Sequence, residues 1–522
     1  MTTSGRPGVF TYENFAPLST GGPPIPGEAL PAICAAYPRG PIQPEMIESF
    51  QQFTKLYGDF TTDPGNLLPY AVNQFFNNGG SSVYVLRLPN TDATSASLGL
   101  VDLESPTPNT IITVTSKSPG TWGSQIYVEV TSAGIAGRVN FNVYLNGSLA
   151  TNRIETFQDV STNPADNRYI VTMVNSPQAG SDFVTLEETL PAGGYVLGST
   201  DLALLSPTPL AGGTDGSVAP DESVVAPPLF DTLIDQALYI NFPGLTDNTK
   251  LTTINTWAEG RGDVMLVVDG PVPANLETNT QVTTNYLNMV TGGSSLPVST
   301  YITLYGPWIL AQDPASTVPG ASRLLPPGGA VLANWQVTDT KDGTVKTPAG
   351  VANTIKAIGL ETQFTAAQLD SLNNAAVNAI KVIPGYGICV FGGRTLHPSY
   401  PDRYIAVRRM LIKIEHDIKW LLKPMIFEPN DADLWDQITS VLNTYLTQLL
   451  QNGQLGGSTP SDSFLVVCDS TLNTPATASA GIVNCNVAVS LLSPAEFINV
   501  TISMFQGQGT ITVQSSGVST SA

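Results

Sequence analysis

Two kinds of predicted strand occur in this sequence, and together they require at least two separate sheets. Residues 237–241 and 264–268 are uninterrupted apolar runs, which is typical of parallel strands covered by helices on both faces. Between residues 92 and 215, segments such as 110–115 and 138–144 instead alternate apolar and polar residues and end at turns rich in glycine and serine. The pattern predicts an α/β layer interrupted by an inserted antiparallel β-domain.

Helical periodicity supports the α/β assignment on either side of the insertion. Apolar residues recur on one face at 67–77, and similar patterns predict helices at 48–56, 247–259 and 365–380. The helix at 247–259 lies between two of the buried strands, which gives a βαβ unit. The chain before and after the insertion is therefore expected to build one α/β core.

The C-terminal part contains the two clearest amphipathic helices. At 402–422 and 431–451 the apolar residues recur at spacings of three and four. Three strands are expected after them, at 464–468, 483–489 and 497–504. This part is predicted to be a helix-and-sheet domain.

Both ends of the chain are rich in Gly, Pro or Ser around one short strand-like run. Such segments are too short to bury themselves, so they are predicted to be arms. The side chains expected to pair as strands there are Val9, Phe10, Tyr12, Phe15, Ile511 and Val513.

The predicted organisation therefore has five parts. They are an N-terminal arm (1–25), an α/β core (26–91 with 216–400), an inserted β-rich domain (92–215), a C-terminal domain (401–505) and a C-terminal arm (506–522).

The charge of the chain excludes one class of partner. Its 522 residues include 22 Lys and Arg against 42 Asp and Glu, a formal net charge of −20. Binding to a phosphate backbone needs clustered cations, so direct contact with nucleic acid is not expected. No apolar run is long enough to span a bilayer and no secretory signal is visible, so we expect no membrane insertion and synthesis in a cytoplasm.

Few residues are available for catalysis. The chain has two histidines, and the sequence predicts His416 on the polar side of a helix and His397 in a loop, both at the surface. The motifs of nucleophile elbows, phosphate loops, dinucleotide-binding turns and zinc proteases are missing. A carboxylate pair suited to glycoside hydrolysis stays open. We expect a protein that is not an enzyme, with no cofactor.

Three aspartates lie close together at the start of the second C-terminal helix. Asp431, Asp433 and Asp436 suggest a Ca²⁺ loop, but the glycine and final glutamate of such a loop are missing. Carboxylates are also favoured at a helix N-terminus by the helix dipole, and we prefer this interpretation. No metal site is expected.

The first C-terminal helix carries an unusual concentration of basic residues. Residues 403–423 contain six basic residues against Glu415 and Asp417, so this segment is positive on a strongly negative chain. The six are Arg403, Arg408, Arg409, Lys413, Lys419 and Lys423. They form either an ordinary solvated face or a docking surface for an acidic partner.

The four cysteines, Cys34, Cys389, Cys468 and Cys485, are too few for a disulfide framework and form no CxxC pair. They are interpreted as small buried apolar residues. The alternative is that they form disulfides between subunits of an assembly, for which Cys468 and Cys485 are the better candidates because they lie in predicted C-terminal strands.

Several motifs resemble those of one protein family and occur in the family's order. In the C-terminal part they are RRMLIKIEHDIKW, FEPNDADLW, NGQLGGSTPSDSFLVVCD and SPAEFINVTI; upstream they are RPGVFTYE, FFNNGGSSVYVLRL, KSPGTWGSQIYVEV, LAGGTDG, WAEGRGDVMLVVDGP, YGPWILAQDP, LLPPGGAVLANW and CVFGGRTL. The chain resembles contractile tail sheath proteins of bacteriophages, which are related to the sheaths of tailocins and extracellular contractile injection systems. The likeness is weakest at 131–209.

The resemblance implies a fold and a function. The fold would be an α/β core of subtilisin-like topology without proteolysis, with terminal arms exchanged between subunits. The function would be that of a sheath subunit in helically stacked hexameric rings, which contract and drive a tail tube through a cell envelope for phage DNA ejection. The implied partners are other copies of the chain, the tube protein, and baseplate and tail terminator proteins, in a virion tail assembled in the host cytoplasm.

Within this resemblance the basic helix is expected to face the tube. The sheath of a headless injection system or tailocin is the alternative function. A baseplate or adhesin component and a subtilisin-like hydrolase are the remote ones.

Overall fold

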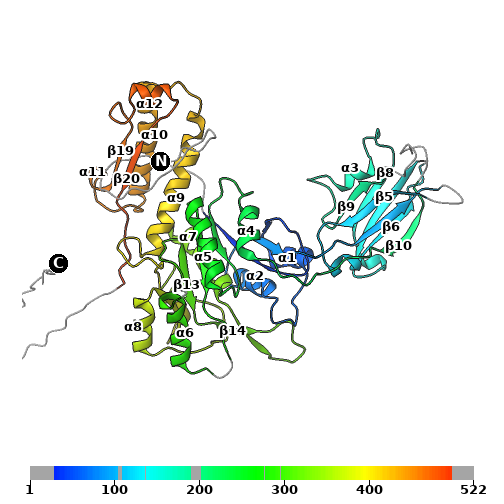
Figure 1. The fold of residues 1–522 in the computed structure, drawn as a ribbon, viewed down its shortest axis with the longest axis horizontal. Coiled ribbons are helices and arrows are strands. Elements are labelled where there is room, and N and C mark those ends of the chain that lie inside the picture. The colour runs from blue at the N-terminus through cyan, green and yellow to red at the C-terminus, as the bar shows by residue number, and fades with distance from the viewer. Residues whose placement is uncertain are drawn as a thin grey trace, which may run out of the picture.

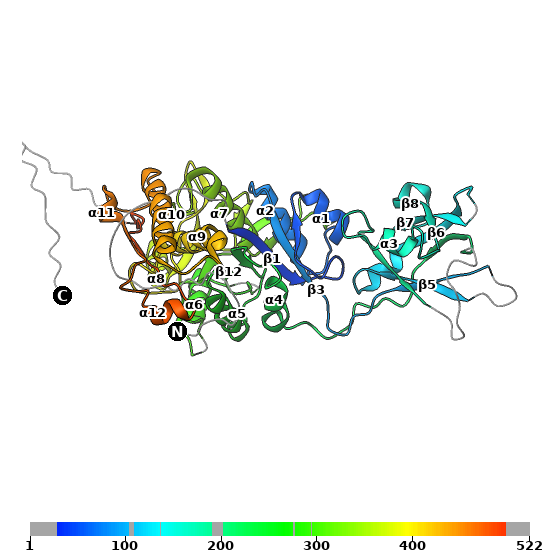
Figure 2. The ribbon, with the colours of Figure 1, turned by 90° about the horizontal axis from the view of Figure 1, so that it is seen from above.

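The computed structural model describes residues 29–103, 109–135, 137–189, 202–274, 277–293 and 295–496. It shows a mixed α/β fold with several sheets, in which the α/β part lies between an elongated β-rich part and a C-terminal helical part (Figures 1 and 2).

An eight-stranded sheet, in the order β18-β17-β13-β12-β11-β1-β3-β2, forms the centre of the molecule. Its six inner strands are parallel, while β2 and β18 pair antiparallel at the two edges. The strands are β1 (Leu30–Ala36), β2 (Glu45–Ile47), β3 (Val83–Leu88), β11 (Leu238–Asn241), β12 (Val264–Asp269), β13 (Ile302–Gly306), β17 (Val377–Ile383) and β18 (Gly387–Val390). Strands β11 and β12 are buried at every position, as their uninterrupted apolar runs predicted.

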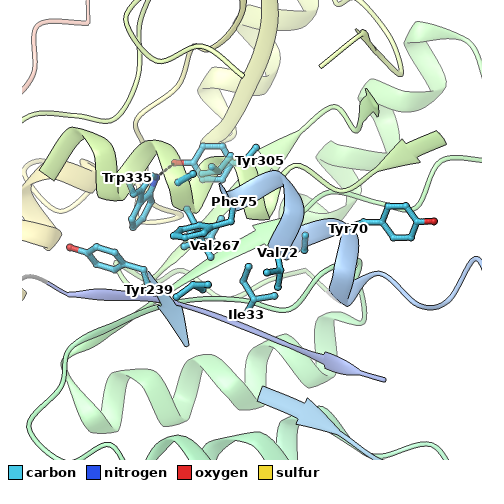
Figure 3. Close-up of a cluster of buried hydrophobic side chains, with 14 of the residues drawn as sticks. Ile33, Tyr70, Val72, Phe75, Tyr239, Val267, Tyr305 and Trp335 are labelled. Atoms are coloured by element: carbon cyan, nitrogen blue, oxygen red, sulfur yellow. Dashed lines mark hydrogen bonds between the residues drawn. The ribbon is translucent and has the colours of Figure 1, made fainter. Parts of the chain in front are cut away.

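Helices cover both faces of this sheet, and each layer encloses its own apolar core. One layer contains α1 (Phe50–Tyr57), α2 (Leu68–Asn77) and α7 (Gly328–Asp342). The other contains α4 (Glu222–Phe230), α5 (Asn248–Arg261), α6 (Asn279–Thr291) and α8 (Ala366–Asn374). In the first core, Phe75 of α2 and Trp335 of α7 lie over the sheet near Tyr239 (Figure 3).

One predicted helix is wrong in its second half. The pattern at 365–380 was continuous, but α8 ends at Asn374 and the chain then enters β17. Ala376, with a φ of 59°, reverses the backbone there, and β17 pairs with β13 in the central sheet. Sheet pairing therefore overrides a helical pattern made of Ala, Ile and Leu.

The β-rich part contains two antiparallel sheets around a separate apolar core. One sheet has the order β10-β6-β7-β8 and the other β4-β5-β9. Its elements are β4 (Ser97–Val101), β5 (Thr110–Ser116), β6 (Ile126–Ser132), β7 (Arg138–Leu145), β8 (Arg153–Ser161), α3 (Ile170–Val174), β9 (Val184–Glu188) and β10 (Leu205–Pro209), with short 3₁₀ turns η1 (Thr121–Gln125) and η2 (Ala150–Asn152). The alternating segments thus form the antiparallel strands that they predicted.

A separate three-stranded sheet has the order β15-β14-β16. Its strands are β14 (Ile309–Gln312), β15 (Ser322–Leu325) and β16 (Gly359–Leu360).

The C-terminal part packs two long helices against a two-stranded sheet, around a fourth apolar core. Its elements are α9 (Ile405–Leu422), η3 (Lys423–Met425), α10 (Ala432–Gln451), α11 (Pro460–Ser463), β19 (Phe464–Val467), α12 (Pro475–Ser479) and β20 (Asn486–Val489). Both predicted helices are confirmed. The strand predicted at 497–504 lies outside the described residues.

Candidate assembly interface

Helix α9 connects the C-terminal part to the α/β core, and a buried arginine forms the joint. Arg409 is fully buried and its guanidinium makes an ion pair with the carboxylate of Asp339 on α7. The same guanidinium lies 5.3 Å from the ring centroid of Tyr239 and 5.0 Å from that of Trp335. Ion pair and ring contacts together compensate the cost of burying this charge.

Arg408 has a similar role on the same turn of the helix. It is 2% exposed, its guanidinium lies 4.5 Å from the ring centroid of Tyr301, and its Nη1 donates to the Tyr301 hydroxyl at 3.2 Å. The prediction that Arg408 and Arg409 face a tube is therefore wrong. A helical wheel shows one polar side, but α9 packs through Ile405 and Ile412 on the α/β core and through Ile414 on the C-terminal core.

The middle of α9 contains a second buried charge network. The Asp417 side chain is 1% exposed, and its Oδ2 accepts from Lys413 Nζ at 2.9 Å and from the Tyr445 hydroxyl of α10 at 2.7 Å. His416, predicted at the surface, is also buried: its Nε2 lies 2.6 Å from the carbonyl oxygen of Asp235, and the neighbouring Asp417 carboxylate raises the pKa of the imidazole. These contacts use the polar side of the helix inside the subunit.

The C-terminal end of α9 does present charge to the solvent. We define the α9 end patch as Lys419, Trp420 and Lys423. Trp420 is 49% exposed, and Lys423 Nζ lies 5.0 Å from its ring centroid and 2.5 Å from Asp235 Oδ2. Lys419 is partly exposed one turn before Lys423. A cation beside an exposed aromatic ring suits contact with an acidic protein surface.

The other two basic candidates lie outside this patch. Arg403 is partly exposed and donates to the Pro398 carbonyl. Lys413 forms an ion pair with the buried Asp417. The tube-facing assignment of Arg403, Lys413, Lys419 and Lys423 stays a prediction, and the α9 end patch is its most accessible part.

The C-terminal sheet is a second surface suited to assembly. Strands β19 and β20 pair antiparallel, with Phe464 opposite Val489 and Val467 opposite Asn486. Among the described residues no third strand pairs with either of them, so within that part of the chain no strand uses the backbone donors and acceptors of the two outer edges. Phe464 and Val466 pack into the C-terminal core on one side of the sheet, so this packing holds both edges of the sheet in place. Such an edge can accept an added strand.

The arm residues cannot be placed on these edges. Val9, Phe10, Tyr12, Phe15, Ile511 and Val513 all lie outside the described residues. Their pairing with a neighbouring subunit stays a prediction.

The four cysteines differ in their access to a neighbouring subunit. Cys34 and Cys389 are 0% exposed in the α/β part, so neither reaches another chain unless that part opens. Cys468 is 4% exposed beside the C-terminal core, and Cys485 is partly buried on the same core. The structure thus brings Cys468 and Cys485 together and separates them from the other two.

A hollow of about 480 Å³ lies at the carboxyl ends of β1 and β11, where ligands bind in many open α/β sheets. The two charged residues that line the hollow already have partners within the protein. Glu222 forms an ion pair with Lys250 at 2.6 Å, and Arg323 donates to the Pro64 carbonyl at 2.7 Å. Neither histidine lines it.

Within the described ranges, no group of three His, Cys, Asp or Glu residues is arranged to hold a metal ion. Nor does any helix in those ranges have the length and apolarity needed to cross a membrane. Of the three aspartates, Asp433 lies in the first turn of α10, and the Asp431 carboxylate caps the helix by accepting from Leu434 N–H at 3.1 Å.

The comparisons with known proteins define the class of this fold: it is a mixed α/β multidomain fold shared with tail sheath proteins. The sheath protein in the contracted helical sheath of the anti-feeding prophage is 19% identical, with a TM-score of 0.55 over 96% of this chain and 99% of that one. The sheath protein in the contracted sheath of the extracellular contractile injection system PVC is 18% identical, with a TM-score of 0.54 over 96% of this chain and 98% of that one. The sheath tail protein Lin1278 from Listeria innocua is 16% identical, with a TM-score of 0.52 over 86% of this chain and 90% of that one.

The sequence comparison then identifies one part of the chain. Residues 401–505 match the family model described as the phage tail sheath C-terminal domain. Among curated proteins, no relative matches the chain at a significant level of similarity. The resemblance to contractile tail sheath proteins is confirmed, in sequence for the C-terminal domain and in fold along nearly the whole chain.

Proposed function

We propose that this chain is the structural subunit of a contractile tail sheath. The subunits assemble as helically stacked hexameric rings around a tail tube, and contraction of the sheath drives the tube through the target envelope for phage DNA ejection. The observation that carries the proposal is the sheath C-terminal domain at 401–505, joined by α9 to a core whose fold is similar to sheath proteins solved in the contracted state.

Strand addition is the proposed linkage between subunits. The Gly- and Pro-rich arm 1–25 and the Ser-rich arm 506–522 each contain one strand-forming run, and the edges of β19 and β20 accept such runs. Main-chain hydrogen bonds to an arm on a flexible tether persist when the subunits rotate as rigid bodies. Head-to-tail contacts of this kind build open helical assemblies.

Contraction requires no nucleotide in this account. The extended sheath is a metastable packing of folded subunits, and the contracted sheath buries more contact. A gain of about 1–2 kcal/mol per subunit, comparable to one or two net hydrogen bonds, adds up over a long helical array. The buried Arg409–Asp339 joint keeps the C-terminal domain attached to the core while the lattice rearranges.

The proposal also covers the organisation and the contacts of the subunit. It includes the five-part division of the chain, the subtilisin-like topology of the core, the non-enzymatic role, and contacts with tube, baseplate and tail terminator proteins. The α9 end patch is the proposed contact with the tube, and location in a virion tail assembled in the host cytoplasm follows from the function.

A headless contractile injection system is the second candidate. The observation that favours it is coverage: the prophage and PVC sheaths align with 96% of this chain, whereas the Listeria innocua protein aligns with 86%. Electron microscopy of the native particle separates the two, because the phage carries a DNA-filled head on the tube.

Deletion of one arm tests the proposed linkage. The chain without residues 506–522 should stay folded and monomeric where the full chain forms rings or tubes, as measured by analytical ultracentrifugation with circular dichroism as the folding control. Removing 1–25 should have the same effect. Unchanged polymerisation of both shortened chains would contradict strand exchange.

A further inference from the structure

Cys468 and Cys485 occupy directly opposed positions at the end of the two-stranded sheet. The last pair of the ladder is Val467 opposite Asn486. Cys468 is the next residue after β19, and Cys485 is the residue just before β20. One further step of the antiparallel register therefore places the two cysteines across from each other.

The alternation of the ladder favours a close approach at this step. Ser490 N–H donates to the Ser463 carbonyl at 2.7 Å, so Ser463 and Ser490 form a hydrogen-bonded pair. Pairs alternate along an antiparallel ladder, and five steps further the opposed cysteines form a non-hydrogen-bonded pair. The Cα atoms of such a pair are about 4.5 Å apart, within the range of about 4.4–6.8 Å that a disulfide spans.

Both cysteine side chains lie on the side of the sheet that faces the C-terminal core. Cys468 belongs to the C-terminal core and Cys485 packs against it. The interaction between the two thiols lowers the pKa of Cys468 and raises the pKa of Cys485.

The segment that carries Cys485 is fixed by a buried asparagine. Asn473 is 1% exposed; its Nδ2 donates to the Asn484 carbonyl at 2.9 Å, and its Oδ1 accepts from Asn484 N–H at 2.6 Å. Asn473 Nδ2 also lies 3.8 Å from the Cys468 sulfur. Asn473 therefore fixes the residue before Cys485 and contacts Cys468 at the same time.

We propose that Cys468 and Cys485 form a disulfide within one subunit when the protein meets an oxidising disulfide, and that this bond locks β19 to β20. The proposed bond is an alternative to the inter-subunit disulfides that the sequence left open for this pair. It joins the two inner edges and does not involve the outer edges of the sheet, so it stiffens the sheet without blocking strand addition. The proposal does not depend on the sheath function.

The reaction balances as two thiol–disulfide exchanges. The Cys468 thiolate attacks one sulfur of glutathione disulfide and releases one glutathione thiolate, which takes up a proton. Cys485 then loses its proton, and its sulfur attacks the Cys468 sulfur of the mixed disulfide, releasing the second glutathione. Two protein thiols are oxidised and one small disulfide is reduced to two thiols.

Mass spectrometry of the full-length chain tests the proposal. After incubation with glutathione disulfide, the intact mass should fall by two hydrogen atoms, and a non-reducing digest should contain the Cys468–Cys485 cross-link. Two of the four cysteines, Cys34 and Cys389, should remain open to alkylation in denaturant. Amide hydrogen exchange in β19 and β20 should slow upon oxidation.

Two variants provide the comparison. Cys485→Ala should abolish the cross-link, whereas Cys389→Ala, which alters a buried cysteine of the α/β part, should retain it. Four alkylated cysteines after oxidation, a covalent dimer through Cys468 or Cys485, or glutathione retained on either residue would each overturn the proposal.

Discussion

At the scale of single residues, buried arginines connect separate parts of this protein. Arg87 is 1% exposed and donates to the carbonyls of Tyr37, Gly40 and Pro119, which joins the α/β core to the segment after β5 in the β-rich part. Arg409 joins α9 to α7. The sequence shows where these residues stand in a helix or strand, but their burial depends on which element packs against them, so the pattern alone could not predict it.

Removing the charge at Arg409 should destabilise the subunit strongly. Arg409→Ala leaves the Asp339 carboxylate buried without its partner, which costs about 3–5 kcal/mol. Lys423→Ala is the matched control, because the Lys423–Asp235 pair is exposed and such pairs contribute about 0–1 kcal/mol. Thermal unfolding measures both. Equal shifts of the unfolding midpoint in the two variants would contradict the connector role.

The half-buried carboxyl group of Glu361 should make the stability of the subunit fall with rising pH. Burial raises the pKa of Glu361 to about 7, with the nearby Glu277 adding to the shift, against an ordinary value of 4.5. The folded state thus holds this proton more tightly than the unfolded state. The stabilisation is fully present below about pH 4.5 and is lost as the pH rises through about 7.

The variant Glu361→Gln tests this pH dependence. Its amide stays neutral and can still accept from Trp308 N–H, which donates to Glu361 at 3.1 Å, so stability should change less between pH 5 and pH 8. Asp269, whose pKa burial raises to about 6, accounts for part of the slope that remains. Exposed Glu428→Gln is the control. An unchanged slope of unfolding free energy against pH in Glu361→Gln would count against the assignment.

At the scale of elements, the sequence predicts types well wherever periodicity is long or alternation is strict. Both C-terminal helices, the antiparallel strands at 110–115 and 138–144, and the buried strands of the core are confirmed. The segment 365–380 fails because a short apolar run of Ala, Val and Ile fits a helix and a parallel strand equally, and only pairing with β13 decides between them.

The start of α10 offers a test of local helix chemistry. Asp431→Ala removes the carboxylate that caps Leu434 N–H and should cost about 0.5–2 kcal/mol. Asp433→Ala is the control, because Asp433 lies in the first turn and makes only the weaker interaction with the helix dipole, about 0.3–1 kcal/mol. Chemical denaturation should show the larger loss for Asp431→Ala; the reverse order would contradict the capping assignment.

At the scale of the whole molecule, the shape follows from the two kinds of strand. The parallel strands form the central sheet of the α/β core. The alternating strands form a β-rich part with its own apolar core, and this part extends away from the α/β core (Figure 2). The candidate site is less predictable: the sequence identified the basic helix and the cysteine-bearing strands. It could not show that two of the six basic residues are buried or that Cys468 and Cys485 meet.

The exposed charge on α9 should matter for binding the tube and not for folding. Lys419→Glu with Lys423→Glu reverses the α9 end patch and should weaken co-assembly with an acidic tube surface while secondary structure is unchanged. Lys356→Glu, an exposed lysine on the α/β part, is the control for charge change. Co-sedimentation with the tube protein measures the effect. Full co-assembly of the doubly reversed variant would exclude the patch as the tube contact.

We propose that subunits of this chain form a sheath by donating arms to the β19–β20 sheets of their neighbours. A cryo-electron microscopy reconstruction of the native particle shows whether they do. We expect sixfold rings stacked helically around a tube, with segments that contain Val9–Phe15 or Ile511–Val513 from neighbouring subunits paired to the outer edges of β19 and β20. A particle without a surrounding helical array, or arms that pair with their own subunit's sheet, would contradict it.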